Sequence, residues 1–534
     1  MERVRDALHA RPFRREPRRP IALVQTHIST VFITTRYVFK FKRPLDVGFV
    51  DFRSLASRRH FCREELRLNR RLAPDVYLGV VPLRSGPGGL TFGRRGRIVD
   101  YAVLMKRLPA ERMLDTRLRA GKALPADMDG LADVLARFHR RLRSTPRLAR
   151  FGELETWRRN WRENFEQTRP EIGLTLSAAT HDALRSRVFD FLRRYRALVR
   201  ARVAGGYVRN GHGDLRCEHI CLSKPIRIID CVEFSERFRC GDVANDLAFL
   251  LMDLCAFGQP GLAARLLERY RERTGDRSMR ALIPFYACYR AFVRGKVLGM
   301  RLRDRNLAPQ TRDAVTARAR RFFALAEAFA QQMGPPLLLA VCGLMGVGKT
   351  TLAEKLAART GMALLSSDRI RKELAADAGR PRRDHSAFGA GIYTEAWTRR
   401  TYAAMFDRAE ETLAGGTSVI LDASFSRRVQ RRRALALARR LGAEPYVVEC
   451  VAPDAITLAR LGAREREGTS LSDGRPELYL RQKSAFDPVV EIAPARHLRV
   501  RTDRPADEVA TEILNTNTLR IPAPLFGLVR AADT

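Results

Sequence analysis

The sequence lacks the features of a membrane, secreted or disulfide-rich protein. No apolar run approaches the roughly 20 residues that a membrane-spanning helix needs. The N-terminal segment MERVRDALHARPFRREPRRP is basic but has no apolar segment behind it, so we expect no secretory signal. The nine cysteines are scattered and odd in number, without a paired C-x-x-C spacing, which is typical of a reducing cytoplasm. We therefore expect a cytoplasmic protein with no membrane partner.

Acidic residues are also scarce relative to basic ones, with 59 Asp and Glu against 98 Lys and Arg and a net charge of +39. Such an excess can mark a protein that binds nucleic acid or another polyanion. Here most of the basic residues are arginines, spread along the whole chain beside abundant alanine, as a GC-rich genome produces. We favour this compositional explanation and keep a nucleic-acid partner as the alternative.

The residue pattern indicates two domains. Residues 1–333 combine strand-like stretches such as TVFITT and YVFKFK with long helix-periodic segments, which predicts an α+β domain. Gly334-Pro335-Pro336 then interrupts the helical pattern. In residues 337–505 apolar strands alternate with helices, which is typical of an α/β domain with a parallel sheet. We expect residues 506–534 to form a C-terminal tail.

The start of the second domain contains a phosphate-binding motif. LLLAVCGLMGVGKTTLAEKLAA places G-x-x-x-x-G-K-[ST] between an apolar run and an amphipathic helix, the context of a P-loop. Glycines let backbone N–H groups surround the phosphates, and the helix N-terminus adds positive potential. Lysine reaches the β- and γ-phosphates of ATP, and the following hydroxyl holds Mg²⁺. The predicted nucleotide-binding residues are Gly343, Gly346, Gly348, Lys349, Thr350 and Thr351, with Thr350 also a metal ligand.

Further candidates follow in the second domain. The strand SVILDASF ends in Asp422, where a carboxylate holds Mg²⁺ in the Walker B arrangement or activates the acceptor. In SSDRIRKELA, Asp368 and Arg371 are three residues apart at a helix start and place a proton acceptor beside a cation. Arg464, in LARLGAREREGTS, suits a lid that closes on the transferred phosphoryl group. Helix capping and surface decoration are the alternatives.

These residues together resemble the small P-loop kinases, which include polynucleotide 5′-kinases, gluconate and shikimate kinases and zeta toxins. The D-x-x-R at Asp368 looks most like the polynucleotide-kinase and zeta-toxin group. The resemblance covers roughly residues 337–500 and implies phosphoryl transfer to a hydroxyl. In it, Asp368 is the base and Arg464 lies in a mobile lid.

The first domain carries a second set of candidate residues. GHGDLRCEH precedes the strand PIRIID, the layout of kinase-like catalytic and metal-binding loops. Asp214 would then accept the proton of an acceptor hydroxyl, and Asp230 would hold Mg²⁺. Upstream, Lys40 in YVFKFK and Glu65 on the next helix match the Lys–Glu pair of a nucleotide-binding lobe. We also expect Asp246 to brace the catalytic loop.

This half resembles the aminoglycoside phosphotransferase family, a branch of the protein-kinase-like fold, which implies a bilobal domain. THISTVFITTRYVFKFKRP, HFCREELRLNRRLAPDVYLGVVP and DVANDLAFLLMDL look like a bacterial lineage that joins such a domain to a P-loop kinase. Its name is the bifunctional aminoglycoside phosphotransferase/ATP-binding protein family. Two features depart from the family pattern. His219 stands where Asn ligates the second Mg²⁺, and THIST replaces a Gly-rich loop.

A zinc site built on Cys217, His219 and Cys221 is the alternative for this loop, although its spacing matches C-x₂₋₄-C only approximately. We predict an ATP- and Mg²⁺-dependent phosphotransferase that acts on a small or phosphorylated acceptor. In the first alternative, the P-loop half is an NTPase switch and the kinase-like half a sensor without catalysis. In the second, the protein is a nucleic-acid 5′-hydroxyl kinase.

Overall fold

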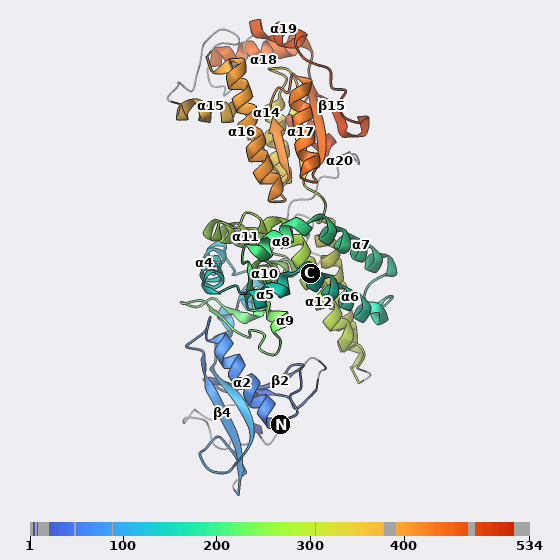
Figure 1. Ribbon diagram of the computed structural model, residues 1–534. Helices are drawn as coiled ribbons and strands as arrows, with labels where there is room; N and C mark the ends of the chain where they lie inside the picture. Colours follow the sequence, from blue (N-terminus) through green and yellow to red (C-terminus); the bar gives the residue numbers. More distant parts are fainter. Residues whose placement is uncertain are drawn as a thin grey trace. The chain divides into compact units, whose positions relative to one another are not determined.

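A computed structural model describes residues 21–516 except 47, 49, 88, 305, 379–390 and 468–475, together with Val4, Arg5 and Leu8. The chain divides into two compact units (Figure 1). The first contains residues 1–276 and 285–327, and the second contains residues 277–284 and most of the chain beyond 327. Among the described residues, no helix has the length and apolar character needed to span a membrane.

The first unit begins with a six-stranded antiparallel sheet in the order β1-β2-β3-β6-β4-β5. Alternation along β3 places Phe39 and Phe41 in one buried cluster and Val38 in a cluster with residues of α2 on the other face. Lys40 and Lys42 share the face of Val38 and therefore point toward α2. The elements are β1 (Ala22–Gln25), β2 (Ser29–Ile33), β3 (Tyr37–Lys42), α2 (Leu55–Asn69), β4 (Tyr77–Gly86), β5 (Gly89–Thr91) and β6 (Arg97–Lys106).

The remainder of the first unit is mainly helical. Its central helix, α10, is buried at almost every position because apolar residues surround its whole circumference. Two short strand pairs, β7–β10 and β8–β9, flank the loop that contains Asp214. The elements are α3 (Leu114–Arg119), α4 (Pro125–Arg141), α5 (Pro146–Ala149), α6 (Leu154–Thr168), α7 (Ala178–Arg194), α8 (Arg196–Ala204), β7 (Val208–Asn210), η5 (Cys217–His219), β8 (Ile220–Cys221), β9 (Arg227–Ile228), α9 (Glu236–Arg239), β10 (Cys240–Asp242), α10 (Val243–Ala256), α11 (Pro260–Thr274), α12 (Met279–Arg301) and α13 (Pro309–Gln331).

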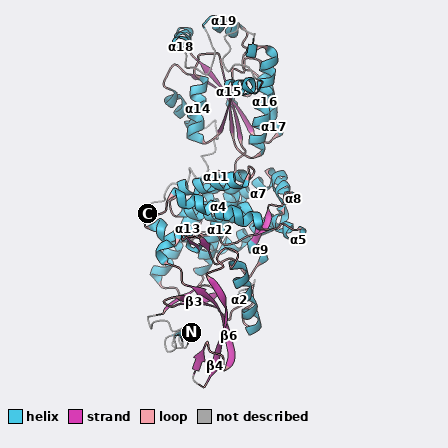
Figure 2. Cartoon of the chain, turned by 90° about the vertical axis from the view of Figure 1, so that its left-hand side faces the viewer, coloured by secondary structure: helices cyan, strands magenta, loops and turns pink. Residues whose placement is uncertain are grey.

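The second unit is built on a five-stranded parallel sheet in the order β12-β13-β11-β14-β15, with helices on both faces (Figure 2). This confirms the predicted α/β fold with a parallel sheet. The elements are β11 (Leu337–Cys342), α14 (Lys349–Thr360), β12 (Ala363–Ser366), α15 (Ser367–Asp377), α16 (Glu395–Ala414), β13 (Val419–Asp422), α17 (Arg428–Arg440), β14 (Glu444–Val451), α18 (Asp454–Glu467), α19 (Pro476–Ser484), β15 (His497–Arg501) and α20 (Ala506–Asn515).

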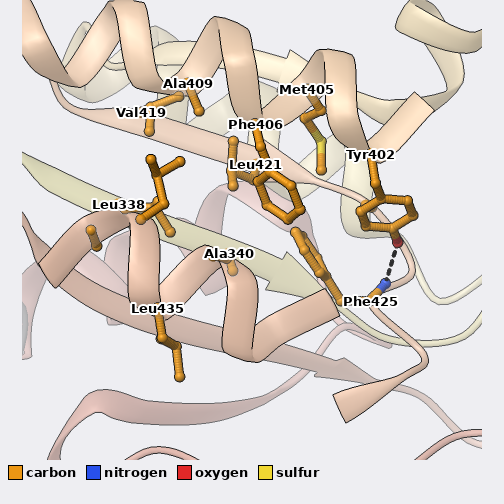
Figure 3. Close-up of a cluster of buried hydrophobic side chains, with 14 of the residues drawn as sticks. Leu338, Ala340, Tyr402, Met405, Phe406, Ala409, Val419, Leu421, Phe425 and Leu435 are labelled. Carbon is orange, nitrogen blue, oxygen red and sulfur yellow. Dashed lines mark hydrogen bonds between the residues drawn. The ribbon is translucent and has the colours of Figure 1, made fainter. Parts of the chain in front are cut away.

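The central strand β11 is buried on both faces, as its unbroken apolar sequence predicts. Leu338 and Ala340 pack with residues of α16 and α17 (Figure 3). Leu337 and Leu339 pack on the opposite face with residues of α14 and α20. The three layers place the carboxyl ends of the strands along one edge, where ligands bind in this type of sheet.

Our prediction of a C-terminal tail from residue 506 is wrong for residues 506–515. Residues 506–515 form α20, and Val509, Ala510 and Ile513 are fully buried in the core beside α14. Their spacing of one, three and four gives α20 a single apolar face, a helix-period signal within the segment that we predicted as a tail.

Candidate active sites

The glycines of the predicted P-loop have the backbone conformation that the motif requires. Gly343, Gly346 and Gly348 have positive φ angles of 137°, 76° and 94°. A Cβ atom on Gly346 would lie 2.8 Å from Cγ of Leu461, and one on Gly343 would lie 2.4 Å from the backbone oxygen of Cys450. Both the backbone angles and the close approach of neighbouring atoms therefore require glycine here.

Lys349, Thr350 and Asp422 meet at the edge of the sheet where β11 and β13 end. The Thr350 hydroxyl donates a 2.9 Å hydrogen bond to Oδ2 of Asp422. Nζ of Lys349 donates to the backbone oxygen of Leu344 at 2.7 Å. Burial raises the pKa of Asp422, although the nearby Lys349 charge opposes this. Thr351 follows in the first turn of α14 with an exposed side chain.

Asp368 and Arg371 lie on the first turns of α15, directly after β12. Nη1 of Arg371 is 3.7 Å from Oδ1 of Asp368, so the guanidinium and the carboxylate lie next to each other. The guanidinium lies over the Tyr393 ring, 4.7 Å from its centroid. Its buried Nε has no hydrogen-bond acceptor among the described residues. The Asp368 carboxylate is 30% exposed and therefore open to an acceptor.

The predicted lid residue Arg464 lies within α18, but its side chain is outside the described part of the structure, so its role stays a prediction. One contact of a neighbouring segment was missed from the sequence. Oε1 of Gln482, on α19, accepts a 2.7 Å hydrogen bond from the backbone N–H of Met345 in the P-loop. No motif marks this contact, because glutamine is common on helix surfaces.

In the first unit, Lys40, Glu65 and Asp230 are brought together from β3, α2 and the loop after β9. Nζ of Lys40 is 2.8 Å from Oε1 of Glu65 and also contacts Asp230. The predicted Lys40–Glu65 ion pair is therefore present. Burial lowers the pKa of Lys40, but the two carboxylates outweigh it and hold the pKa well above its usual value. Asp230 has a left-handed backbone with φ 64°, which is rare outside glycine.

A second lysine extends this ion pair. Lys42 is fully buried and contacts both Glu65 and Glu233. Glu233, three residues after Asp230, was missed as a site residue, although it follows the predicted strand PIRIID almost directly, in DCVEF. The group thus contains two lysines and three carboxylates, of which only Asp230 is substantially exposed, and it ties β3 and α2 to the Asp230 loop. Burying so many charges is costly unless each is paired.

The predicted brace by Asp246 is confirmed. Its two carboxylate oxygens accept backbone hydrogen bonds from His212 at 2.7 Å and Gly213 at 2.8 Å. Nε2 of His139 lies 3.2 Å from Oδ2 of Asp246. Burial raises the pKa of Asp246, but the hydrogen bonds and the two histidines hold it well below its usual range. The loop before Asp214 is therefore anchored to the first turn of α10.

Asp214 is paired with a residue of its own loop. Nε and Nη2 of Arg216 each lie 2.9 Å from a carboxylate oxygen of Asp214, a bidentate arrangement. Nη1 of Arg216 also contacts Glu218. Burial raises the pKa of Asp214, but Arg216 and His219 outweigh it and lower the pKa below its usual value. A deprotonated carboxylate suits a proton acceptor, but this one already has a cationic partner.

His219 lies between Asp214, the predicted proton acceptor, and Asp230, the predicted metal ligand. Its Nδ1 is 2.8 Å from the backbone oxygen of Asp214, which makes Nδ1 the protonated nitrogen. Its Nε2 is 3.4 Å from Oδ2 of Asp230. The imidazole thus lies where the resemblance places an asparagine ligand. Since Mg²⁺ prefers oxygen ligands, this half offers fewer suitable donors than the P-loop half.

The zinc alternative finds no support in the described residues, where no three His, Cys, Asp or Glu side chains form a group able to hold a metal ion. Cys217 and Cys221 are buried free thiols. Burial raises the pKa of Cys217, which disfavours the thiolate that zinc would need.

The P-loop half fits a magnesium nucleotide. Its left-handed glycines turn backbone N–H groups inward, and Thr350 and Asp422 supply adjacent oxygen donors. In the first unit Lys40 would meet the phosphates, and Asp230 offers one carboxylate to the metal.

Comparison with known proteins identifies both halves. The model of the phosphotransferase enzyme family matches residues 25–282, and that of the AAA domain matches residues 338–489. Uncharacterized proteins of Mycobacterium tuberculosis and Mycobacterium bovis are each 32% identical to this chain over 446 residues. The alignment covers 82% of this chain and 85% of each relative, so the similarity extends across both halves.

Solved structures are similar to parts of this chain. A choline/ethanolamine kinase family protein from Mesorhizobium loti is 14% identical and covers 62% of this chain and 98% of its own, with a TM-score of 0.37. A gluconokinase from Sinorhizobium meliloti 1021 is 20% identical and covers 37% of this chain and 94% of its own, with a TM-score of 0.25.

Proposed function

The chain belongs to the family of two-domain proteins that join an aminoglycoside-phosphotransferase-like domain to a P-loop kinase domain, and on this premise we propose that it is an ATP-dependent phosphotransferase. In this proposal the P-loop half transfers the γ-phosphate of ATP to a hydroxyl of its acceptor. The kinase-like half binds a nucleotide or a small ligand.

One observation carries the proposal for the P-loop half. The Thr350–Asp422 pair and the Asp368–Arg371 pair lie at the ends of β13 and β12, which are neighbouring strands of the sheet. The first pair suits the metal and the second suits the acceptor, so donor and acceptor sites adjoin as in-line transfer requires.

Each residue then has a distinct task. When bound, MgATP supplies the phosphoryl group and part of the neutralising charge. Thr350 and Asp422 hold the metal, and Lys349 leaves the Leu344 carbonyl for the phosphates. Asp368 takes the proton of the acceptor hydroxyl, and Arg371 stabilises negative charge beside it.

The test is ATP turnover of the full-length chain in a screen of hydroxyl acceptors with γ-labelled ATP. Lys349→Ala should reduce labelled product at least about 100-fold, because one preorganised charge on the transferred group contributes that much. Lys355→Ala, which removes an exposed lysine on α14, is the matched control and should leave product formation unchanged. Wild-type turnover in the Lys349→Ala protein would refute the proposal.

A second candidate function concerns the kinase-like half. The bidentate Arg216–Asp214 pair and the imidazole of His219 favour a ligand sensor without catalysis. An Asp214→Asn protein distinguishes the two functions when it also carries Lys349→Ala. A catalytic first unit predicts residual turnover that Asp214→Asn abolishes, whereas a sensor predicts no residual turnover to lose.

A further inference from the structure

Helix α12 brings two arginines to the loop that carries Asp214. Arg290 is 7% exposed, and its Nη1 donates a 3.1 Å hydrogen bond to the backbone oxygen of Gly213. Its Nε donates to Oδ1 of Asn245 at 3.0 Å. Arg294 follows one helical turn later on the same face, close enough to Asp214 and Arg216 for their charges to act on it.

Arg290 is buried and Arg294 is half-buried, and neither has a carboxylate partner among the described residues. Arg290 lies over the Phe249 ring at 4.6 Å, and Arg294 lies over the Phe322 ring at 5.5 Å. Nε of Arg294 is buried and donates no hydrogen bond within the described part of the chain. Burial lowers the pKa of both groups, as expected for cations whose charge is not balanced by a contacting anion.

The carboxylates in the neighbourhood are engaged elsewhere. Asp214 and Glu218 both contact Arg216. Oδ2 of Asp253 accepts a 2.8 Å hydrogen bond from the backbone N–H of Cys217. Burial raises the pKa of Asp253, and no ion pair joins this carboxylate to Arg294 among the described residues. Neither arginine of α12 therefore has a contacting carboxylate beside the position where the kinase-like layout places the acceptor.

We propose that the ligand bound beside Asp214 in the kinase-like half is an anion, such as a hydroxyl compound bearing a phosphate or carboxylate, held by Arg294 and Arg290. This inference deepens the proposed function, since it rests on the ligand lying beside Asp214. It separates this chain from a phosphotransferase that acts on an aminoglycoside. Such a polycation would meet two guanidinium groups that have no contacting carboxylate, and like charges in a partly buried site repel strongly.

Inorganic phosphate is a suitable probe, measured by calorimetry and thermal shift at constant ionic strength. The full-length chain should carry Lys349→Ala in every sample, which weakens phosphate binding at the P-loop. Arg294→Gln should weaken phosphate binding about tenfold, the loss expected for one charge-assisted hydrogen bond. Arg187→Gln, at an exposed position on α7, is the matched control, and Arg294→Lys should keep part of the affinity.

Kanamycin provides the opposite probe and should neither stabilise the chain nor compete with phosphate. Equal phosphate affinity in Arg294→Gln and Arg187→Gln, or stabilisation by kanamycin, would overturn the inference. Phosphate binding through Arg294, together with no phosphoryl transfer by the chain that retains Lys349, would refute the proposed function alone. Phosphate affinity that does not depend on Arg294, in a chain whose Lys349 form transfers phosphoryl groups, would refute this inference alone.

Discussion

At the residue scale, the side chain of His219 decides which ligand atoms the kinase-like half offers to Mg²⁺. It lies between Asp214 and Asp230, within 2.8 Å of the backbone of one and 3.4 Å of the carboxylate of the other. An asparagine has a shorter side chain with an amide oxygen, which is a good ligand for Mg²⁺. Asp246 also anchors the loop, through the backbone N–H groups of His212 and Gly213.

His219→Asn should therefore raise Mg²⁺-dependent turnover of the kinase-like half about tenfold, the usual effect of restoring a group near a metal. The measurement is ATP consumption by full-length protein that carries Lys349→Ala. His219→Gln is the control, because glutamine carries the same amide one methylene farther from the backbone and so does not place it where an asparagine would. No gain in either variant would mean that the Arg216–Asp214 pair, not the missing ligand, limits the reaction.

His212 determines how the first unit responds to acid. Its Nε2 donates to the backbone oxygen of Ile229 at 3.0 Å, and its Nδ1 accepts from the Asp214 N–H at 3.3 Å. A second ring proton would displace the Asp214 hydrogen bond. Burial lowers the pKa of His212 from 6.5 to about 4, although Asp246 opposes the shift.

Stability should therefore fall as the pH drops from about 6.5 toward 4, because the unfolded chain binds a proton that the folded chain excludes. Between pH 7 and pH 5 the loss is about 2 kcal/mol. Thermal unfolding at both pH values measures it, and His212→Gln should remove this part of the difference. His27→Gln changes an exposed histidine and should keep it. An unchanged difference in the His212→Gln protein would contradict the prediction.

At the element scale, the P-loop depends on segments distant in the sequence. Its strand, its glycines and the start of α14 follow from local sequence alone. Its surroundings do not, because Thr457 and Leu461 of α18 close over Gly346 from more than a hundred residues away. Gln482 and α20 join the same unit without any motif.

Gly346→Ala tests this packing. The added Cβ would meet Leu461 at 2.8 Å and Thr457 at 3.0 Å, so α18 must shift and nucleotide binding should weaken at least about tenfold. Gly442→Ala is the control, since it has a similar positive φ of 68° with no atom within 4 Å of the new Cβ. Both should lose about 1–2 kcal/mol of unfolding free energy from backbone strain. Titration with ATP should separate them, and equal affinities would contradict the packing argument.

At the scale of the whole molecule, the net charge of +39 does not by itself indicate a nucleic-acid partner. Many surface arginines pair with carboxylates, as in Arg147–Glu236, Arg265–Asp129 and Arg440–Glu410. Exposed pairs of this kind contribute about 0–1 kcal/mol each. The arginines therefore look like ordinary surface residues of an arginine-rich protein.

Oligonucleotides with a 5′-hydroxyl should accordingly not be labelled by the wild-type chain at about 150 mM salt. Weak association at low salt is expected, and it should fall steeply with added salt because it is electrostatic. A gel assay with γ-labelled ATP checks this, with a fully 5′-phosphorylated oligonucleotide as the control. Labelling that persists at that salt concentration and requires Lys349 would favour the nucleic-acid kinase instead.

By itself the sequence determined both fold classes, the P-loop, Asp422, the Asp368–Arg371 pair and the Lys40–Glu65 pair, because short motifs and strand periodicity are local. Only the tertiary structure decided that Arg216 pairs with Asp214, that Lys42 and Glu233 extend the ion pair, and that α20 belongs to the core. It alone brought Arg290 and Arg294 to the Asp214 loop. These contacts join side chains whose partner depends on direction and burial, and neither property is encoded in the spacing of residues along the chain.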